Sequence, residues 1–240
     1  MSRLTGLRRR AHGLSMRVYG PWAIRRVRQQ RAYRWRGLTL TVPTGVFHPG
    51  LFFSSGVLAT EIEQRRPVGL TVLDVGCGSG LLSLVASRAG ATVVAIDINP
   101  EAVRATAANA RANDLVVEAV QSDLFDSLEG RRFDLVVVNP PYFAKDPVDD
   151  AERAWFAGAD LGYFERFFSG LGDHLVDIPH PGRALMVLSE GCDMGIITAA
   201  AERHGFRMAV TARRRVWLGV QVVWTIDRQS SVSRSGAAPA

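Results

Sequence analysis

The stretch TVLDVGCGSGLLSL, residues 71–84, decides which fold we predict for this chain. Its first five residues form a mostly apolar run, as is typical of a strand buried on both faces of a parallel sheet. A glycine-rich turn follows, and a second apolar run then begins a helix. Glycine adopts the backbone angles of a tight turn and lets the main chain come close to a ligand. The stretch therefore predicts a strand, a ligand-binding turn and a helix.

The spacing of the glycines separates this turn from two other nucleotide-binding motifs. Gly76, Gly78 and Gly80 follow the pattern G-x-G-x-G, whereas dinucleotide sites carry G-x-G-x-x-G. The glycines are also not followed by the lysine that a phosphate-binding loop requires, so such a loop is not expected. The next predicted strand, residues 92–97, ends in Asp97, 21 residues after Gly76. A carboxylate at about that distance in a strand–helix–strand unit reaches the hydroxyls of a ribose.

Polar residues stand at the ends of four successive predicted strands. Asp74 and Asp97 end the first two, Asp123 follows the strand expected at residues 116–121, and Asn139 ends the next. Ligands of open α/β sheets bind at the carboxyl ends of the strands. The four polar ends therefore indicate one ligand site along that edge of the sheet.

The tetrapeptide Asn139-Pro140-Pro141-Tyr142 has the chemistry of a site for a planar NH2 group. The prolines fix φ and remove two backbone donors, so the local carbonyl groups are free to accept hydrogen bonds. The asparagine side chain adds a further acceptor, and the tyrosine adds a flat face. Two acceptors take the two protons of an NH2 group while the ring packs on its plane. A turn that is merely stiffened by proline is the alternative interpretation.

In this order, the glycine turn, Asp97, Asp123 and the N-P-P-Y tetrapeptide resemble the class I S-adenosylmethionine-dependent methyltransferases, from about residue 42 to 226. The resemblance implies a Rossmann-like α/β fold with a seven-stranded, mostly parallel sheet and an antiparallel last strand. It implies S-adenosylmethionine as the cofactor, with Asp97 on the ribose hydroxyls and Asp123 on the adenine amino group. Further cofactor contacts are implied for Asp74, Gly76, Gly78, Gly80, Ile98, Leu124 and Asn139.

Within that family, N-P-P-Y resembles the subset that methylates planar nitrogens, and the match is closest to the short branch of the HemK-type protein-glutamine N5-methyltransferases. The segment DINPEA at residues 97–102 and the segment AWFAGADLG at residues 154–162 also resemble this branch. The chain departs from it after VFHPG, residues 46–50, where the branch places an acid followed by threonine and this chain reads LFFSS. The glycine pair of the branch is only partly kept, as Ala157-Gly158. These departures concern the substrate rather than the methyl donor.

The predicted catalytic residues are Asn139, Pro140 and Tyr142. Asn139 Oδ1 and the Pro140 carbonyl would accept the two N–H bonds, and Tyr142 would pack against the plane of the acceptor. A metal is not expected, because a sulfonium methyl is already activated and the five histidines lack the spacing of metal ligands. The leading hypothesis is methylation of a protein glutamine, as in a release-factor-like translation factor. Methylation of adenine N6 or guanine N2 in RNA or DNA, methylation of a small molecule, and a cofactor-binding scaffold without chemistry remain alternatives.

The positive charge of the chain is concentrated at its N-terminus. Residues 1–36 contain 11 arginines and no acid, so the remainder of the chain carries a net charge of −5 although the whole carries +6. Arginines interleaved with aromatic residues suit a nucleic-acid backbone and its bases. A basic helix packed on the domain is an equal alternative, and a membrane-surface helix is a weaker one. We predict a basic extension over 1–36, a methyltransferase domain over 37–227 and a disordered tail over 228–240.

Other classes of protein are excluded by composition. No run approaches 18 apolar residues and no signal peptide is evident, so a membrane-spanning or secreted protein is not expected. Two cysteines provide no disulfide framework, which favours a cytoplasmic location. Arg213–Arg215 is predicted as the tip of a hairpin between the last two strands, either solvated or holding an acidic partner. We predict helices at 54–65, 80–89, 100–113, 161–175 and 193–204, and strands at 38–42, 71–75, 92–97, 116–121, 133–139, 183–189, 206–212 and 216–226.

Overall fold

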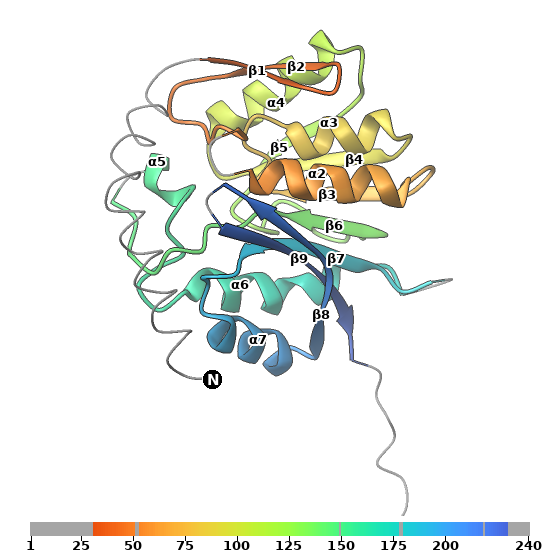
Figure 1. The fold of residues 1–240 in the computed structure, drawn as a ribbon. Coiled ribbons are helices and arrows are strands. Elements are labelled where there is room, and N and C mark those ends of the chain that lie inside the picture. Colours follow the sequence, from red (N-terminus) through yellow and green to blue (C-terminus); the bar gives the residue numbers. More distant parts are fainter. Residues whose placement is uncertain (1–30, 51–52, 149, 178–179, 218, 230–240) are drawn as a thin grey trace, which may run out of the picture.

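A seven-stranded sheet forms the centre of the molecule in the computed structural model, which describes residues 31–50, 53–148, 150–177, 180–217 and 219–229 (Figure 1). The strands lie in the order β5-β4-β3-β6-β7-β9-β8. The first five in this order are parallel, whereas β9 is antiparallel to both of its neighbours. The predicted mostly parallel sheet with an antiparallel last strand is therefore confirmed. The bounds of the strands are Thr71–Val75 (β3), Thr92–Asp97 (β4), Glu118–Gln121 (β5), Leu135–Val138 (β6), Arg183–Ser189 (β7), Phe206–Val216 (β8) and Gly219–Arg228 (β9).

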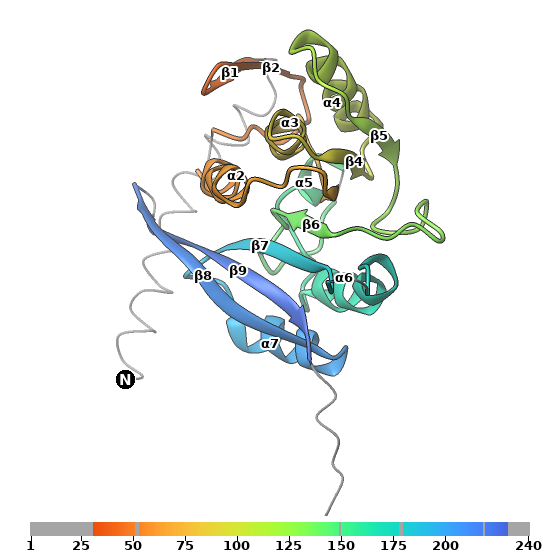
Figure 2. The same ribbon diagram turned by 90° about the vertical axis from the view of Figure 1, so that its right-hand side faces the viewer.

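Helices cover both faces of the sheet (Figure 2). One face carries α2 (Ser54–Arg65), α3 (Leu81–Arg88) and α4 (Pro100–Ala112). The other carries α6 (Gly162–Leu171), a 3-10 turn (Gly172–His174) and α7 (Met194–Arg203). None of the described helices is long and apolar enough to cross a membrane. A short helix, α5 (Asp150–Arg153), which the sequence did not predict, lies in the loop between β6 and α6.

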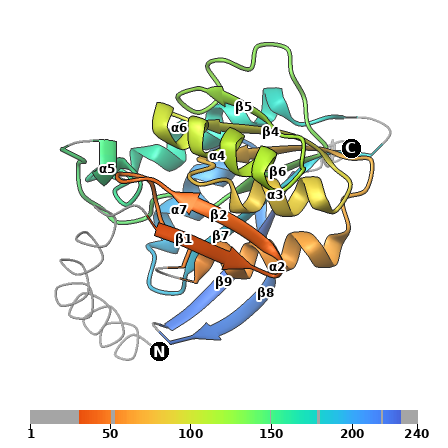
Figure 3. The same ribbon diagram turned by 90° about the horizontal axis from the view of Figure 1, so that it is seen from above.

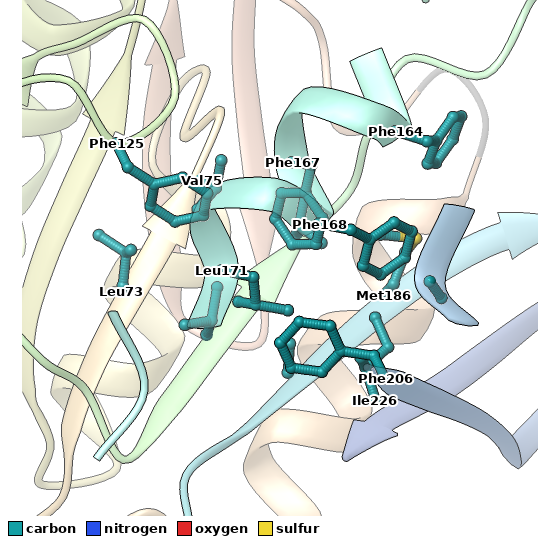
Figure 4. Close-up of a cluster of buried hydrophobic side chains, with 14 of the residues drawn as sticks. Leu73, Val75, Phe125, Phe164, Phe167, Phe168, Leu171, Met186, Phe206 and Ile226 are labelled. Atoms are coloured by element: carbon teal, nitrogen blue, oxygen red, sulfur yellow. The ribbon is translucent and has the colours of Figure 1, made fainter. Parts of the chain in front are cut away.

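The alternation of side chains along each strand divides the core into two clusters. Val72 packs with Leu58 of α2 and Leu84 of α3, whereas its neighbour Leu73 faces the opposite cluster with Phe167 of α6. Figure 4 shows this second cluster, in which aromatic side chains of α6 pack against side chains from β3, β7 and β9. Because both faces of β3 and β6 are buried, these strands are apolar except at Thr71, which begins β3, and at Asp74.

Local sequence signals begin the helices that flank the glycine turn. Asn99 caps α4 by accepting a hydrogen bond from the Glu101 backbone N–H at 2.9 Å, and proline occupies the first helical position. Gly80 precedes α3 with a φ of 89°. A Cβ at Gly80 would lie 2.9 Å from Oγ1 of Thr106, so glycine also allows α3 to approach α4 closely.

A two-stranded hairpin precedes the sheet and lies along α4. It pairs β1 (Arg31–Trp35), which the sequence did not predict, with β2 (Leu38–Val42). The side chain of Asn109 exchanges two hydrogen bonds with the backbone of Thr41, and Asn113 does the same with Thr39. The predicted boundary at residue 36 falls in the turn of this hairpin. The rest of the predicted basic extension, residues 1–30, lies outside the described residues. The disordered tail predicted over 228–240 is wrong at its start, because Arg228 ends β9 and the Gln229 N–H donates to the Gly205 carbonyl at 2.8 Å. Residues 230–240 lie outside the described residues.

The last hairpin differs from the prediction. Arg213–Arg215 is not its tip but part of β8, which continues to Val216, and the turn begins at Trp217. The backbone of these arginines pairs with the segment Val220–Val222 of β9. Strand pairing uses backbone groups, so a run of charged side chains continues a strand when its partner is long enough. A bulge between Val210 and Ala212 interrupts the ladder.

Gly182 provides a test of the packing between β6 and β7. A Cβ at Gly182 would lie 2.6 Å from the Phe133 carbonyl oxygen and 3.1 Å from the Val176 backbone nitrogen, and neither can move alone. We expect Gly182→Ala to lower the free energy of unfolding by about 2 kcal/mol and the melting temperature by about 6 °C. In the matched variant Gly195→Ala, the nearest atom, Asp193 Oδ1, is 3.5 Å away, so no loss is expected. Equal melting temperatures for the two variants would contradict the prediction.

Candidate active site

A cavity of about 290 Å³ lies at the carboxyl ends of β3, β4 and β6. Segments that are distant in the sequence form its wall. Besides the strand ends, they include the loop before α2, the first turn of that helix, and the loop that carries α5. The lining includes residues within 45–49, 54–55, 75–79, 96–99, 122–124, 139–143 and 153–158.

Most residues predicted for the site meet at this cavity. Its lining contains Gly76, Gly78, Asp97, Ile98, Asp123, Leu124, Asn139, Pro140 and Tyr142. Two predicted residues are not on the lining. Asp74 is fully buried on β3, and Gly80 faces α4 through Thr106.

The glycine turn presents its backbone to the cavity. Gly76 has a φ of 72° and Gly78 a φ of 55°, angles that other residues rarely adopt. A Cβ at Gly76 would meet no atom within 4 Å, so that position faces open space. A side chain there would fill the space into which a ligand could bind.

Asp97, at the end of β4, keeps capacity for a ligand. Its Oδ2 accepts a hydrogen bond from the Gly78 backbone N–H and its Oδ1 accepts one from the Asn99 N–H, each at 2.9 Å. Burial raises the pKa of the carboxyl above its ordinary value, and these hydrogen bonds oppose that shift only in part. An ionised carboxylate has about four acceptor positions, so about two remain for the hydroxyls of a diol. The residue therefore fits the predicted ribose contact.

The turn that carries Asp123 is held by a neighbouring serine. The buried Ser122 hydroxyl donates to the Leu124 carbonyl at 2.8 Å and accepts from the Ser127 N–H at 3.0 Å. Leu124 takes a φ of 50° in this turn. Asp123 forms an ion pair of 2.9 Å with Arg166 of α6, which also lines the cavity and was not predicted. One carboxylate oxygen and the turn backbone thus border the cavity beside a cation.

Asp74 is buried with an unsatisfied oxygen. Its Oδ2 accepts hydrogen bonds from the backbone N–H of Ser83, at 3.0 Å, and from the hydroxyl of the same residue. Its Oδ1 is buried without a hydrogen-bond partner. Burial raises the pKa of this carboxyl to about 7. The residue therefore caps the start of α3 behind the glycine turn and can be protonated near neutral pH.

The raised pKa of Asp74 predicts a pH dependence of stability for the free protein. Between its ordinary pKa near 4 and the folded value of about 7, the folded state holds a proton that the unfolded state releases, so stability falls as pH rises. We expect Asp74 to account for a loss of about 3 kcal/mol between pH 5 and pH 8. Urea unfolding at both values should show this loss in the wild type and a smaller one in Asp74→Asn. The exposed Asp126→Asn is the control and should behave as the wild type does.

Asn139 is oriented by a contact that sequence reasoning missed. Its Nδ2 donates a hydrogen bond of 2.9 Å to Oγ of Ser55, in the first turn of α2. Among the described residues, nothing donates a hydrogen bond to Asn139 Oδ1 or to the Pro140 carbonyl. Two acceptors at the wall of the cavity are therefore available to a ligand. Ser55 lies in the stretch that departs from the HemK pattern, and its place at the start of a predicted helix was the only signal for it.

Aromatic residues form the outer wall. Tyr142 is half-buried against the core and lies 4.8 Å from the Phe143 ring, and burial raises its pKa, so the phenol stays neutral. The rings of Phe47 and Trp155 are 5.1 Å apart. Trp155 lines the cavity while being only 8% exposed, so it serves both the wall and the packing. The backbone N–H of Phe143 donates to the Trp155 carbonyl at 3.1 Å, which joins the loop after N-P-P-Y to this wall.

No group of three or more metal-ligating side chains is arranged to hold an ion in the described parts of the chain. The polar side chains that line the cavity are carboxylates, asparagine amides, serine hydroxyls and the guanidinium groups of Arg153 and Arg166. Together with backbone carbonyl oxygens they suit an organic ligand that carries hydroxyl and amino groups.

Part of the chain matches a known protein family. Residues 37–160, about half of the chain, match the family described as Methyltransferase small domain. The Ribosomal RNA small subunit methyltransferase C of Chromohalobacter salexigens is 39% identical over 122 residues, which make up 49% of this chain and 36% of that protein. The match thus spans about a third of this curated relative.

Two solved structures share the fold. One is the 16S rRNA N2 G1207 methyltransferase of T. thermophilus in complex with AdoMet and guanosine, with a TM-score of 0.59 and 24% identity over 84% of this chain and 50% of that one. The other is the E. cuniculi Mtq2-Trm112 complex responsible for methylation of the eRF1 translation termination factor, with a TM-score of 0.59 and 23% identity over 78% of this chain and 99% of that one. At these identities the likeness concerns the fold alone.

Proposed function

The chain belongs to the methyltransferase small domain family, whose cofactor is S-adenosylmethionine, and from this premise we propose that it methylates a planar nitrogen bearing two hydrogens. The acceptor would be an amide or an exocyclic amino group. Both kinds of nitrogen are conjugated and weakly nucleophilic, so the site must orient the lone pair and stabilise the charge that develops.

The cavity fits the cofactor in three places. Asp97 keeps acceptor positions for the ribose hydroxyls, and the turn at Asp123 and Leu124 offers a carboxylate oxygen and backbone groups to the adenine. The glycine turn at Gly76 leaves open space beside its backbone for the amino-acid part. S-adenosylmethionine supplies a methyl group already activated by a positive sulfonium.

The orientation of Asn139 carries the proposal. Because Nδ2 is held by Ser55, the side chain presents Oδ1 rather than its donor to the acceptor nitrogen. Asn139 Oδ1 and the Pro140 carbonyl then accept the two N–H bonds, which directs the lone pair away from them. Both oxygens also stabilise the positive charge on nitrogen during transfer, and Tyr142 packs on the plane of the acceptor. A strong general base is unnecessary, since the charged product nitrogen loses its proton readily.

Two kinds of methyl acceptor carry a planar nitrogen of this type. A protein glutamine, as in a release-factor-like translation factor, is supported by the N-P-P-Y tetrapeptide and by the segments at 97–102 and 154–162 that resemble the HemK branch. An adenine or guanine amino group in RNA is supported by the 11 arginines of residues 1–36 and by the arginines of β8. Both acceptors are found in the cytoplasm, where we expect the protein to act.

The test is transfer of a radiolabelled methyl group to a lysate of undermethylated source cells, with the wild type and Asn139→Ala in parallel. Treatment with protease or with nuclease then identifies the labelled class of molecule. Label removed by protease supports a glutamine acceptor, and label removed by nuclease supports a nucleobase. Binding of S-adenosylmethionine without any incorporation by the wild type would contradict the proposal and favour a small-molecule acceptor or a scaffold.

A further inference from the structure

The β8–β9 hairpin extends well past the edge of the sheet at which the cavity lies. Val138 is the last residue of β6 and pairs with Met186 of β7. In the same register, Met186 pairs with Trp224 of β9, and Trp224 pairs with Val210 of β8. The six residues 211–216 of β8 therefore lie beyond the end of β6. At about 3.3 Å per residue they project roughly 20 Å.

The hairpin projects on the side of the cavity. Arg213 forms an ion pair of 3.3 Å with Glu190, directly after the carboxyl end of β7. The Glu190 backbone N–H also donates to the Val220 carbonyl of β9 at 2.9 Å. Figures 1 and 3 both show the free end of the hairpin on the same side of the sheet as α5, whose Arg153 lines the cavity. The hairpin and the cavity therefore lie at the same edge of the sheet, with β7 between β6 and β9.

Uncompensated positive charge gathers on this projection. Arg213, Arg214 and Arg215 are exposed, and no acidic side chain of the described residues forms an ion pair with the last two. Trp217, in the turn, is 81% exposed. Tryptophan and arginine are the residue types that contribute most to binding surfaces, and here both are exposed side by side.

The combination of arginine and tryptophan favours one kind of partner. Charges on an edge strand also prevent unwanted strand pairing, which accounts for arginines but not for an exposed indole at the tip. Guanidinium groups bind phosphates through two parallel hydrogen bonds, and an indole stacks on any base. An acidic protein would use the arginines and leave the indole in water.

We propose that this hairpin docks single-stranded RNA beside the cavity, with Arg214 and Arg215 on phosphates and Trp217 stacked on a base. The inference rests on the proposed function. Of the two methyl acceptors proposed there, it favours the amino group of a nucleobase, bound at Asn139. The chain is held at the hairpin while one unstacked base enters the cavity.

Binding can be measured without methyl transfer, by the fluorescence anisotropy of a labelled single-stranded 12-nucleotide RNA with the full chain. The double variant Arg214→Gln with Arg215→Gln should bind about tenfold more weakly at 0.15 M salt and lower the slope of log affinity against log salt by about 1.4. Trp217→Ala should bind about tenfold more weakly, and Trp217→Phe should retain most of the affinity because a ring is kept.

A matched control removes two exposed arginines from α4, Arg104→Gln with Arg111→Gln, and should bind as the wild type does. Equal losses in this control and in the hairpin variant would overturn the inference, because binding would then follow net charge alone. An unchanged affinity in Trp217→Ala would also overturn it. Displacement of the RNA by polyglutamate as readily as by unlabelled RNA would point to an acidic protein partner instead.

The same variants separate the docking surface from the chemistry. Hairpin-dependent RNA binding without transfer to RNA would contradict a nucleobase acceptor and leave the docking surface supported. Methylation of RNA with an unchanged KM in the hairpin variants would overturn the docking surface and leave the proposed function intact. The expected result is a raised KM with an unchanged kcat in those variants, and loss of kcat alone in Asn139→Ala.

Discussion

Replacing Asn139 with alanine is expected to lower the rate constant for methyl transfer by about 10²–10³, by analogy with the loss of one preorganised group that stabilises a developing charge. The affinity for S-adenosylmethionine should be nearly unchanged, because the cofactor contacts proposed at Asp97 and Asp123 remain. Single-turnover transfer to the identified substrate and calorimetric titration with the cofactor measure the two quantities separately. Full activity of Asn139→Ala on the true substrate would refute the mechanism.

Two further variants sharpen this test. Ser55→Ala removes the group that orients the Asn139 amide, and we expect a smaller loss of about fivefold, the effect of one neutral hydrogen bond. Asn113→Ala removes an asparagine that bonds only to backbone groups of β2 and α4, and its transfer rate should equal that of the wild type. A loss in Asn113→Ala as large as in Asn139→Ala would indicate a general defect of folding.

Replacing Asp97 with alanine should have the opposite signature. Two hydrogen bonds to a charged carboxylate are lost, and at about 1.5 kcal/mol or more each the affinity for S-adenosylmethionine falls about 100-fold. The variant also removes the acceptor of the Gly78 N–H, so the glycine turn loses part of its support. At saturating cofactor the transfer rate should stay close to that of the wild type.

Calorimetric titration with S-adenosylmethionine and with S-adenosylhomocysteine measures this effect. Both ligands carry the ribose, so both should lose affinity equally. Asp126→Ala makes the same substitution at an exposed aspartate and should bind both ligands as the wild type does. An Asp97→Ala variant with wild-type affinity would show that the ribose binds elsewhere.

The stretch that departs from the HemK pattern takes part in the site. From the sequence, the departure concerns the substrate rather than the methyl donor. In the structure, Ser54 and Ser55 line the cavity, and Ser55 supplies the oxygen that orients Asn139. In the proposed mechanism this stretch would act on the substrate side, because Ser55 orients Asn139 and leaves the two oxygens free.

Several elements could be predicted to the residue, and others could not. The bounds of β3, β4, β7 and α2 match the prediction, because buried strands are continuous apolar runs and turn residues delimit them. The strand β8 continues beyond its predicted end through Arg213–Arg215, since its extension depends on a long partner rather than on its own composition. The strand β1 was missed for the same reason: its alternating arginines and aromatic residues form a strand only through pairing with β2.

Apart from β1 and α5, the sequence by itself determined the order of the strands and helices in the chain, as well as the glycine turn and the four polar residues at or near strand ends. These depend on local rules: the backbone angles that glycine adopts, the missing donors of proline and the periodicity of apolar residues. Only the tertiary structure decided the orientation of Asn139, by a hydrogen bond to a residue 84 positions away, and the pairing of Asp123 with Arg166. It also decided that the arginines of β8 project past the edge of the sheet at which the cavity lies. Contacts of this kind arise from how distant elements pack, and no local pattern in one chain specifies which side chains will meet.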